Sequence, residues 1–545
     1  MKMIKYYAAA MLLSFVLVWV SREGWLLIPS LWISMSFFCV LLAYVTNYPK
    51  IFRKSETGSI PIWIKLLLLP YLAGAQLYNA FARHNDKVPA IQQISSNLFL
   101  ACRLFPTDIE MLEAEGVNAI VDVTAEFDGL NWSAEQEGLY YLNIPILDHY
   151  SPNQAQLVHA INWIKSQHRL QNKVVIHCAL GRGRSFFTLC AYLLVSQPEL
   201  SVREVMQQVQ NIRGTARLNK KQLKSLISVS KQLIEHAPQE LQLIINPVSG
   251  SGKWYQHDNE IIGELTKKYQ LHFHFTEKDT DMTKLTSSLV NACDDTSTFV
   301  ACGGDGTVTQ VASAIKDTPH TLGILPMGTA NALAHVLLGF SSKISPITEA
   351  SKAILNHQTV NMDTMTCNEQ TALLVVAIGY EERMIDHANR EQKNNMGQLA
   401  YIQGFFNALL KNHKMVIKLS LDGQTKQDVQ CSSLAVANAA PFSTLLAQGG
   451  GAPDWQDGLL DITQLDYTDN ASERMLSLAE LVTNSIKQAD NKNFKIQHYQ
   501  AKTVQISCDS MFQYSIDGEI ESACDLTISV QPASLSIIWA NSNNM

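Results

Sequence analysis

Apolar residues are concentrated at the start of the 545-residue chain and become intermittent further on. Two runs there, residues 6–20 and 25–45, contain no charged side chain. A helix needs about 20 apolar residues to cross the hydrocarbon core of a bilayer. The second run is long enough alone, and the first is adequate as half of a pair. The pattern therefore predicts a helical membrane hairpin over the two runs.

The flanking charges give this hairpin an orientation. Lys2 and Lys5 precede the first run, and Lys50, Arg53 and Lys54 follow the second. Because positive residues favour the cytoplasmic side, both ends are predicted in the cytoplasm. The location would be a bacterial-type inner (cytoplasmic) membrane, with the remaining domains on the cytoplasmic side. A signal peptide followed by one helix is the alternative, although no small-x-small cleavage site follows the first run.

A third apolar stretch, residues 61–82, contains Lys65 and Pro70. If it crossed the bilayer, the rest of the chain would lie outside the cytoplasm. We therefore predict a helix that lies in the membrane interface or dips into it, with Lys65 and Arg83 among the lipid headgroups. A buried helix of a soluble core is the alternative. Residues 1–88 are thus predicted to form a membrane anchor.

From about residue 97 the pattern becomes that of a soluble α/β domain, which we predict over residues 89–236. Its expected elements are buried strands at 119–123, 141–147 and 173–176 and an apolar helix at 186–195. The third strand leads directly to Cys178, and a Gly-rich loop separates this cysteine from the helix. The sequence therefore places a cysteine between a strand end and a helix N-terminus.

A thiol in this position becomes reactive. A helix N-terminus and a nearby arginine lower the pKa of a thiol, and the amides of a Gly-rich loop bind an anion. Arg184 can hold two phosphate oxygens with its planar fork. We expect Cys178 to attack phosphorus and form a cysteinyl phosphate that water hydrolyses, and Ser185 to stabilise the leaving thiolate. Arg182 adds a second cation, which would suit an acidic phospholipid headgroup.

The string from His177 to Ser185, HCxxGxxRS, resembles the signature of the dual-specificity branch of the cysteine-dependent protein tyrosine phosphatase superfamily. The resemblance covers roughly residues 95–235. It implies that Asp148, which precedes the cysteine at the family's spacing, is the general acid that protonates the leaving oxygen. A phosphoprotein stays open as the alternative substrate to a phospholipid.

In the second half of the chain, a strand–loop–helix unit repeats three times. Predicted strands at 241–245, 298–302 and 322–325 lead into loops that contain Asn246–Lys253, Gly303–Thr307 and Pro326–Asn331. These loops would converge at the carboxyl edge of a sheet, where α/β sheets bind ligands. The first loop is not a Walker loop, because it lacks the first glycine and carries Trp254 in place of Ser or Thr.

The three loops suit the phosphates of a nucleotide. Glycine lets backbone amides approach phosphate oxygens, and Asp305 offers the hard oxygen that Mg²⁺ prefers. Lys253 can neutralise phosphate charge. Phosphoryl transfer depends mainly on positioning and electrostatics, so these groups suffice except for a base. ATP and Mg²⁺ are the predicted cofactors.

Four strings in order, NPxSG, GGDGT, PxGTxN and DGE, resemble those of the diacylglycerol kinase catalytic family, which includes bacterial lipid kinases. The resemblance covers about residues 240–541 and implies a kinase domain at 237–545. Its parts would be an α/β nucleotide-binding domain at about 237–365, a β-sandwich at about 366–520 and a tail that returns to the first. Alternating stretches at 413–438 and 501–540 fit the sandwich.

Site residues follow from these loops and from the resemblance. The predicted nucleotide-binding set is Asn246, Lys253, Thr276, Gly303, Gly304, Asp305, Gly306, Thr307, Gly328, Thr329 and Asn331. The resemblance implies that Glu519 is the general base for a lipid hydroxyl. It also implies a structural Mg²⁺ held by the carboxylate of Asp457 and the carbonyls of Asp454 and Leu459. The segment 376–380 lacks the asparagine often found before Gly379, which leaves the acceptor lipid open.

Composition narrows the remaining function classes. The ten cysteines form no CxxC pair and no metal-ligand spacing, which fits a reducing cytosol. Residues 1–85 are basic, although the net charge of the chain is −7. No basic stripe with interleaved aromatics occurs, so nucleic acid is not a predicted partner. The predicted partners are a lipid substrate, the membrane bilayer and ATP, and the sequence does not indicate an oligomeric state.

The sequence therefore predicts a multidomain, membrane-anchored enzyme with two activities. One is an ATP-dependent lipid kinase with diacylglycerol as the expected acceptor. The other is a cysteine-dependent phosphatase that acts on a phospholipid headgroup. Two alternatives stay open: the phosphatase acts on a phosphoprotein and regulates the kinase, or one module is an inactive lipid-sensing scaffold.

Overall fold

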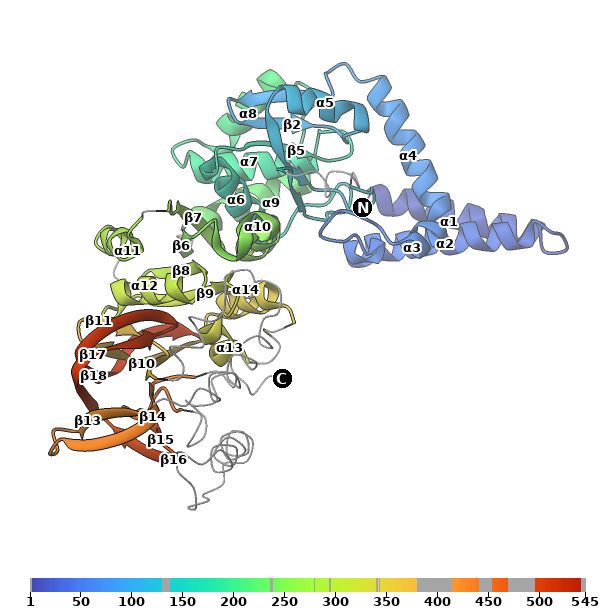
Figure 1. The fold of residues 1–545 in the computed structure, drawn as a ribbon. Helices are drawn as coiled ribbons and strands as arrows, with labels where there is room; N and C mark the ends of the chain where they lie inside the picture. Colours follow the sequence, from blue (N-terminus) through green and yellow to red (C-terminus); the bar gives the residue numbers. More distant parts are fainter. Residues whose placement is uncertain are drawn as a thin grey trace. The chain divides into compact units, whose positions relative to one another are not determined.

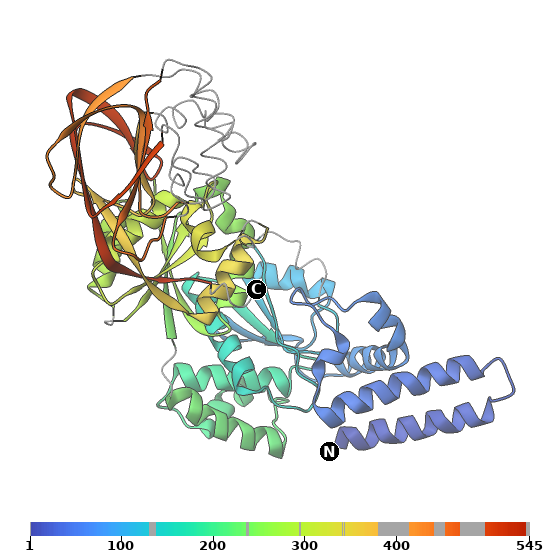
Figure 2. The same ribbon diagram turned by 90° about the horizontal axis from the view of Figure 1, so that it is seen from below.

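The protein folds into two compact units, seen in the computed structural model in Figures 1 and 2. The first unit contains Met1–Gln239 and Ile262–His272, and the second contains Glu240–Ile261 and Phe273–Met545. The structure describes residues 2–129, 138–235, 239–278, 280–293, 296–339, 342, 344–379, 414–440, 453–468 and 496–540.

The first unit begins with two long antiparallel helices, α1 (Lys2–Val20) and α2 (Leu27–Thr46) (Figure 2). Large apolar side chains are exposed along both, as Trp19 at 68% and Ile28 at 77% show. Both helices are long and apolar enough to cross a membrane, by length and composition. A signal sequence would meet the same criteria, so both interpretations from the sequence remain.

The predicted helix at 61–82 is instead two helices, α3 (Ile62–Leu67) and α4 (Leu69–His84). Pro70 lies in the first turn of α4, where proline is tolerated because the first amides of a helix have no partner within it. The indole nitrogen of Trp32 donates to the carbonyls of Leu66 (3.0 Å) and Leu67 (3.2 Å). The junction between α3 and α4 therefore lies about 21 Å along α2 from the C-terminal end of that helix.

The anchor and the domain that follows it share one apolar core. It contains Val40, Tyr44, Phe52, Ile60, Ile64, Leu68, Tyr71 and Leu72 from the anchor, and Ala125 and Leu147 from the domain. Phe52 closes a short 3₁₀ helix, η1 (Pro49–Phe52), that follows α2. The hydroxyl of Tyr150 also donates to the carbonyl of Tyr44. Residues 40–72 of the anchor are thus packed onto the domain.

A five-stranded sheet forms the centre of this domain, in the order β1-β2-β5-β3-β4. The strands are β1 (Ile91–Ser95), β2 (Leu98–Ala101), β3 (Val117–Asp122), β4 (Tyr140–Asn143) and β5 (Lys173–His177). Only the edge strand β1 is antiparallel to its neighbour. The helices are α5 (Pro106–Ala114), α6 (Gln154–Arg169), α7 (Arg184–Ser196), α8 (Val202–Ile212) and α9 (Lys220–Glu235).

The central strand β5 lies between β2 and β3 and is buried on both faces, which explains its continuous apolar sequence. Helix α7 is equally buried, with Phe186 and Phe187 fully inaccessible. The turn from β5 into α7 is therefore fixed at both ends by the core.

The second unit contains a parallel sheet formed by β6 (Gln239–Ile245), β8 (Thr298–Gly303) and β9 (Thr321–Pro326). Strand β7 (Tyr269–Phe275) and helix α10 (Lys253–Leu265) each have residues in both units. The other helices are η2 (Ser249–Ser251), α11 (Met282–Val290), α12 (Asp305–Ile315), α13 (Ala332–Leu338) and α14 (Pro346–Asn356).

In the remaining described part of the second unit, antiparallel strands surround an apolar core. They are β10 (Thr359–Cys367), β11 (Gln370–Ala372), β12 (Val375–Ile378), β13 (Met415–Leu421), β14 (Gln427–Ala437), β15 (Leu460–Asp466), β16 (Ile496–Ala501), β17 (Thr503–Ile516) and β18 (Glu519–Ile538). The long strand β18 pairs first with β17 and then with β10, and its end runs parallel to β9. The tail therefore joins the antiparallel part to the parallel sheet.

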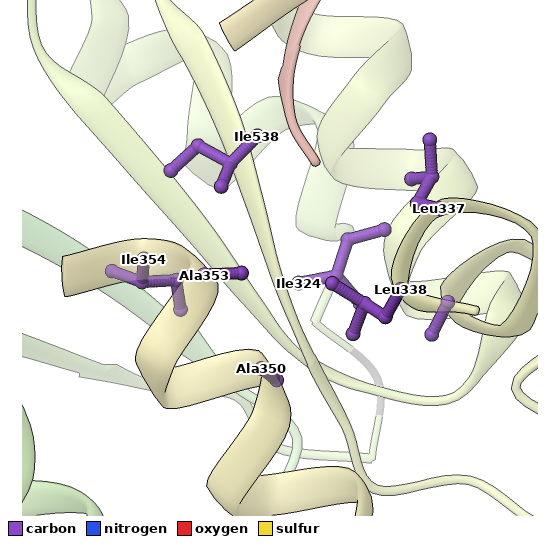
Figure 3. A pocket seen from close by; sticks show the side chains of 8 residues that line it. Ile324, Leu337, Leu338, Ala350, Ala353, Ile354 and Ile538 are labelled. Atoms are coloured by element: carbon purple, nitrogen blue, oxygen red, sulfur yellow. The ribbon is translucent and has the colours of Figure 1, made fainter. Parts of the chain in front are cut away.

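A small apolar pocket lies beside this junction (Figure 3). Its lining side chains are Ile324, Ala334, Leu337, Leu338, Ala350, Ala353, Ile354 and Ile538. These residues belong to β9, α13, α14 and β18. These lining side chains carry no polar group that could bind a phosphate.

Candidate active sites

The first candidate site surrounds Cys178, at the end of β5. The hydroxyl of Ser185 donates to the Cys178 sulfur at 3.2 Å, and Arg184 begins α7 directly behind the loop. Gly181 has φ +64°, and a Cβ there would lie 2.7 Å from the carbonyl oxygen of Ala101. Only glycine fits this turn. The structure thus brings together the predicted cysteine, arginine and serine.

Arg184 is held by a buried carboxylate. Its two terminal nitrogens donate to the two oxygens of Glu126 at 2.6 and 2.8 Å, and one also donates to the carbonyl of Ile146 at 2.7 Å. Burial alone would lower the pKa of Arg184, but the carboxylates of Glu126 and Asp148 raise it well above the usual value. Within the described residues the Arg184 Nε has no acceptor. A rigid, charged donor therefore remains for an anion.

Asp148, the predicted general acid, lies beside this arginine. Its carboxylate is 3.4 Å from Arg184 and is 41% exposed. It also accepts a hydrogen bond from the His149 amide at 3.0 Å. The structure thus places Asp148 next to the anion-binding arginine and open to solvent, where a substrate's leaving group could reach it.

Behind the loop, Asp122 is a buried acceptor for several donors. It accepts from Lys54 at 2.6 Å and from the hydroxyl of Tyr141 at 2.9 Å, and lies 3.8 Å from His177. Although burial would raise the pKa of Asp122, the charges of Lys54 and His177 hold it well below its usual range. Burial also lowers the pKa of His177. These contacts fit a structural role for His177.

The structure gives Arg182 a different partner from the one that the sequence suggested. Its guanidinium pairs with Asp86 at 2.9 Å, and the Asp86 side chain is only 7% exposed. The positive charge is thus matched within the chain, so the geometry does not support Arg182 as a second cation for a lipid headgroup.

The sequence did not single out Glu126 as the partner of Arg184. Glu126 lies four residues beyond Asp122, the end of β3, and Asp122 pairs in register with His177 on β5. Its 4% exposure is unusual for a glutamate. The sequence offered one signal for Glu126, which is its position as a charged residue just after a buried strand. Its partner Arg184 could not be identified in this way, because it lies far along the chain.

We expect Glu126→Gln to lower the free energy of unfolding by about 3–5 kcal/mol, because it leaves the buried Arg184 without its counter-charge. Hydrolysis of a small aryl phosphate should fall as well. Urea unfolding and initial rates on the full chain measure both effects. Glu110→Gln, on the exposed side of α5, is the control and should change stability by less than about 0.5 kcal/mol. Equal stability and activity in the two variants would contradict the assigned role.

The second candidate site lies where the loops after β6, β8 and β9 meet. The amides of Met327 and Gly328 donate to the carbonyl of Gly303 at 2.9 and 3.2 Å. The side chains of Lys253 and Asn331 donate to the carbonyl of Gly328 at 3.0 and 2.9 Å. These five residues link the three loops into one surface.

Glycine is needed where the loops cross. A Cβ on Gly328 would lie 2.6 Å from the Gly304 Cα, and a Cβ on Gly250 would overlap the carbonyl of Met327. Gly250 also has φ +57°, a conformation that favours glycine. Such bare, closely spaced backbone fits a ligand with phosphate groups.

Asp305 lies between the starts of α12 and α13. Its carboxylate accepts the Leu333 amide at 3.4 Å. Burial raises the pKa of Asp305, and the amides of Leu333, Ala332 and Asn331 oppose that rise. Its carboxylate chemistry fits a divalent cation that accompanies a nucleotide.

Four further residues of the predicted nucleotide-binding set differ in their surroundings. Asn246 donates to the Thr307 hydroxyl at 3.4 Å, which connects the first and second loops. The Thr276 hydroxyl is buried and donates to the carbonyl of Ile245 at 3.1 Å. Thr329 is exposed. The structure thus brings Asn246 and Thr307 together and leaves Thr329 open to a ligand.

Glu519, the predicted base, follows a turn that Asp517 holds in place. The Asp517 carboxylate accepts the amides of Leu373, Leu374 and Val375 at 2.8 to 3.1 Å and the hydroxyl of Thr309 at 3.2 Å. A Cβ on Gly306 would lie 3.5 Å from a Glu519 carboxylate oxygen. The turn therefore carries Glu519 to the Gly303–Thr307 loop. The sequence did not indicate this role for Asp517.

The predicted structural metal site lies in the turn before β15. The Asp457 carboxylate accepts the Leu459 amide at 2.9 Å, and that of Asp454 accepts the Gln456 amide at 3.1 Å. Burial raises the pKa of Asp457, and the carboxylates of Asp461, Asp454 and Asp363 add to the rise. No group of three metal-ligating side chains occurs among the described residues. The local negative charge fits a hard cation, and the site stays a prediction.

Three segments of the chain match known protein families. Residues 98–232 match the family described as dual specificity phosphatase, catalytic domain. Residues 240–367 match the diacylglycerol kinase catalytic domain, and residues 374–539 match the YegS C-terminal NAD kinase beta sandwich-like domain. The segments follow one another in the order that the motifs predict.

Relatives of the second half occur in several bacteria. An uncharacterised protein of Synechocystis sp. is 31% identical over 304 residues, which cover 54% of this chain and 69% of that protein. The diacylglycerol kinase of Mycobacterium tuberculosis is 26% identical over 318 residues, 56% of this chain and 97% of that protein. A crystal structure titled as a diacylglycerol kinase from Bacillus anthracis str. Sterne covers 56% of this chain and 98% of its own, at 20% identity and a TM-score of 0.42.

Proposed function

Because the chain belongs to the diacylglycerol kinase catalytic family and also carries a dual-specificity phosphatase domain, we propose that it is a membrane-anchored enzyme that both adds phosphate to a lipid and removes phosphate through a cysteine. The observation that carries the proposal is the pair of complete loop constellations: Cys178 with Arg184, and Asp305 with Glu519. A kinase and a phosphatase activity follow from the two domains.

The phosphatase residues divide the reaction into two steps. The Cys178 thiolate attacks phosphorus, so an S–P bond forms while the P–O bond to the leaving group breaks. Asp148 gives its proton to the leaving oxygen, and Arg184 holds two phosphate oxygens. Water then displaces the thiolate, which the Ser185 hydroxyl stabilises through its 3.2 Å contact. The proposed substrate is a phosphate on a phospholipid headgroup, which the apolar helices packed on this domain support.

The kinase residues position a nucleotide and an acceptor. The crossing loops at Gly304 and Gly328 would hold the phosphates of ATP, and Asp305 would bind the accompanying Mg²⁺. Glu519 takes the proton from the lipid hydroxyl as that oxygen attacks the γ-phosphorus, while the bond from the γ-phosphorus to the β–γ bridging oxygen breaks and ADP leaves. We propose diacylglycerol as the acceptor, because relatives that align over this half are named diacylglycerol kinases.

The anchor gives both activities a common surface. We propose that α1 and α2 form a membrane hairpin whose basic ends lie in the cytoplasm, on the inner membrane of a bacterium. Through Trp32, the junction of α3 and α4 lies about two thirds of the way along α2 from its C-terminal end. This contact supports a segment that dips into the bilayer rather than one that only lies on it.

Labelled ATP and a lipid panel test the kinase. The solubilised full chain should label diacylglycerol, and both Asp305→Ala and Glu519→Gln should lower that labelling by about a hundredfold or more. Asp509→Asn, a substitution of a 92% exposed carboxylate on β17, is the matched control and should keep full activity. The proposal fails if no lipid is labelled by the wild-type chain, or if Asp305→Ala labels as well as wild type.

Hydrolysis of aryl and alkyl phosphates tests the phosphatase. Cys178→Ser should lower both rates by about a thousandfold or more, whereas Cys524→Ser, at an exposed thiol, should change neither. Asp148→Asn should slow the alkyl phosphate by about a hundredfold and the aryl phosphate much less, because a good leaving group needs no proton. Activity that survives Cys178→Ser would refute the cysteinyl-phosphate route.

A further inference from the structure

An anion-binding loop has a second requirement besides its inward amides. When the amides turn toward the anion, the carbonyls turn outward, and buried carbonyls need donors. Within the described residues no protein acceptor is recorded for the amides of Ala179–Gly183, which leaves them for phosphate oxygens. The outward carbonyls of this loop are paired.

Most of these donors come from the phosphatase domain itself. The Arg213 side chain donates to the carbonyls of Gly181 at 2.9 Å and Leu180 at 3.3 Å. The amide of Arg217 donates to the carbonyl of Arg182 at 2.8 Å. The amide of Arg103 donates to the carbonyl of Ala179 at 3.1 Å. All three donor residues lie inside the family match at 98–232.

One donor comes from the anchor. The side-chain amide of Asn79, on α4, donates to the carbonyl of Ala179 at 2.7 Å. Asn79 is only 1% exposed and lies before the family match begins. Its Oδ1 atom is buried with no donor among the described residues. The nitrogen of Asn79 therefore has a defined partner in the loop, directly beside Cys178.

A second residue one turn along α4 strengthens the contact. Arg83 donates to the carbonyl of Arg103 at 2.6 Å and binds the Asp108 carboxylate with both terminal nitrogens at 2.6 and 2.8 Å. Residues four apart share a helix face, so Asn79 and Arg83 hold the hydrogen-bonded pair Arg103–Ala179 from one side.

The opposite side of α4 is apolar and exposed. Leu77 is 73% exposed, Tyr78 68% and Phe81 69%. The start of the same helix lies beside Trp32 of α2. One face of α4 contacts the phosphate-binding loop, and its apolar face points outward. The helix could therefore contact the lipid bilayer and the catalytic loop at the same time.

A second segment of the anchor reaches the other neighbour of Cys178. The Lys54 side chain is 1% exposed and pairs with Asp122, which lies 3.8 Å from His177. Lys54 also donates to the carbonyl of Thr124 at 3.0 Å. The residues on both sides of the cysteine are thus held from the first 85 residues of the chain.

We propose that α4 is a working part of the phosphatase site and that Asn79 is a positioning residue. It fixes the Ala179 peptide so that the loop amides stay turned toward the phosphate. This inference rests on the proposed phosphatase function. The anchor would then do more than hold the protein at the membrane, because its packing against the phosphatase domain would set the affinity of the site for phosphate.

Asn79→Asp in the full chain is the most direct test, because the side chain keeps its shape but an ionised carboxylate cannot donate. At pH 8, kcat/KM for an aryl phosphate should fall about tenfold, as expected for one lost hydrogen bond at a buried group. Inorganic phosphate should also protect Cys178 from alkylation less well, by a similar factor. At pH near 5.5 the introduced carboxyl group is protonated and can donate a hydrogen bond. The kcat/KM of Asn79→Asp, relative to that of wild type at the same pH, should therefore partly recover.

Two controls separate positioning from folding. Asn85→Asp, at the exposed end of α4, should leave the phosphatase rate and the pH profile unchanged. Lipid labelling by the kinase half and the thermal unfolding midpoint should be equal in wild type and Asn79→Asp. Wild-type rates and phosphate protection in Asn79→Asp at pH 8 would overturn the inference, and so would parallel loss of kinase activity and stability. A wild-type chain that hydrolyses no aryl phosphate would instead refute the proposed function itself.

Discussion

A loop that binds phosphate with its amides must give its carbonyls other donors, and both halves of this protein are built around that constraint. In the phosphatase loop, Arg213 alone supports two carbonyls. In the kinase half, the carbonyl of Gly328 accepts from both Lys253 and Asn331. Lys253 was predicted to neutralise phosphate charge, and its contact with Gly328 shows that it also holds one of the loops that would bind the nucleotide.

Charge is also buried around the phosphatase site. Arg184 and Lys54 have side chains that are 1% exposed, and each has a carboxylate partner in Glu126 and Asp122. Breaking such a pair is costly because it leaves one charge buried alone. The catalytic loop is therefore rigid before a substrate arrives, which favours binding of a phosphate in one orientation.

Elements with a local signature were predictable from the sequence. Strand β5, its Gly-rich loop and helix α7 follow from an apolar run, glycines and a second apolar run, and the family match over 98–232 confirms the phosphatase fold. The lipid kinase half and its β-sandwich are confirmed in the same way. The break at Leu68 was missed, because Pro70 in an apolar stretch is compatible with either a kinked helix or a new one.

Partners from distant parts of the chain were not predictable. Glu126, Asn79, Lys54 and Asp517 act through contacts that only the folded chain creates, and nothing in their immediate neighbours marks them. The domain borders at 88, 236 and 365, the assigned catalytic roles and the Mg²⁺ turn at Asp457 stay predictions. Tyr380, in the lipid-side segment, lies outside the described residues.

If both activities serve the bilayer surface, the phosphatase should prefer a lipid substrate, and a direct comparison of phosphatase substrates tests this preference. The full chain, reconstituted in vesicles, would receive either a lipid phosphate monoester in the same bilayer or a phosphotyrosine peptide in solution. We expect Cys178-dependent release of phosphate from the lipid, with kcat/KM at least about tenfold above that for the peptide. Hydrolysis of the peptide with no release from the lipid would contradict it.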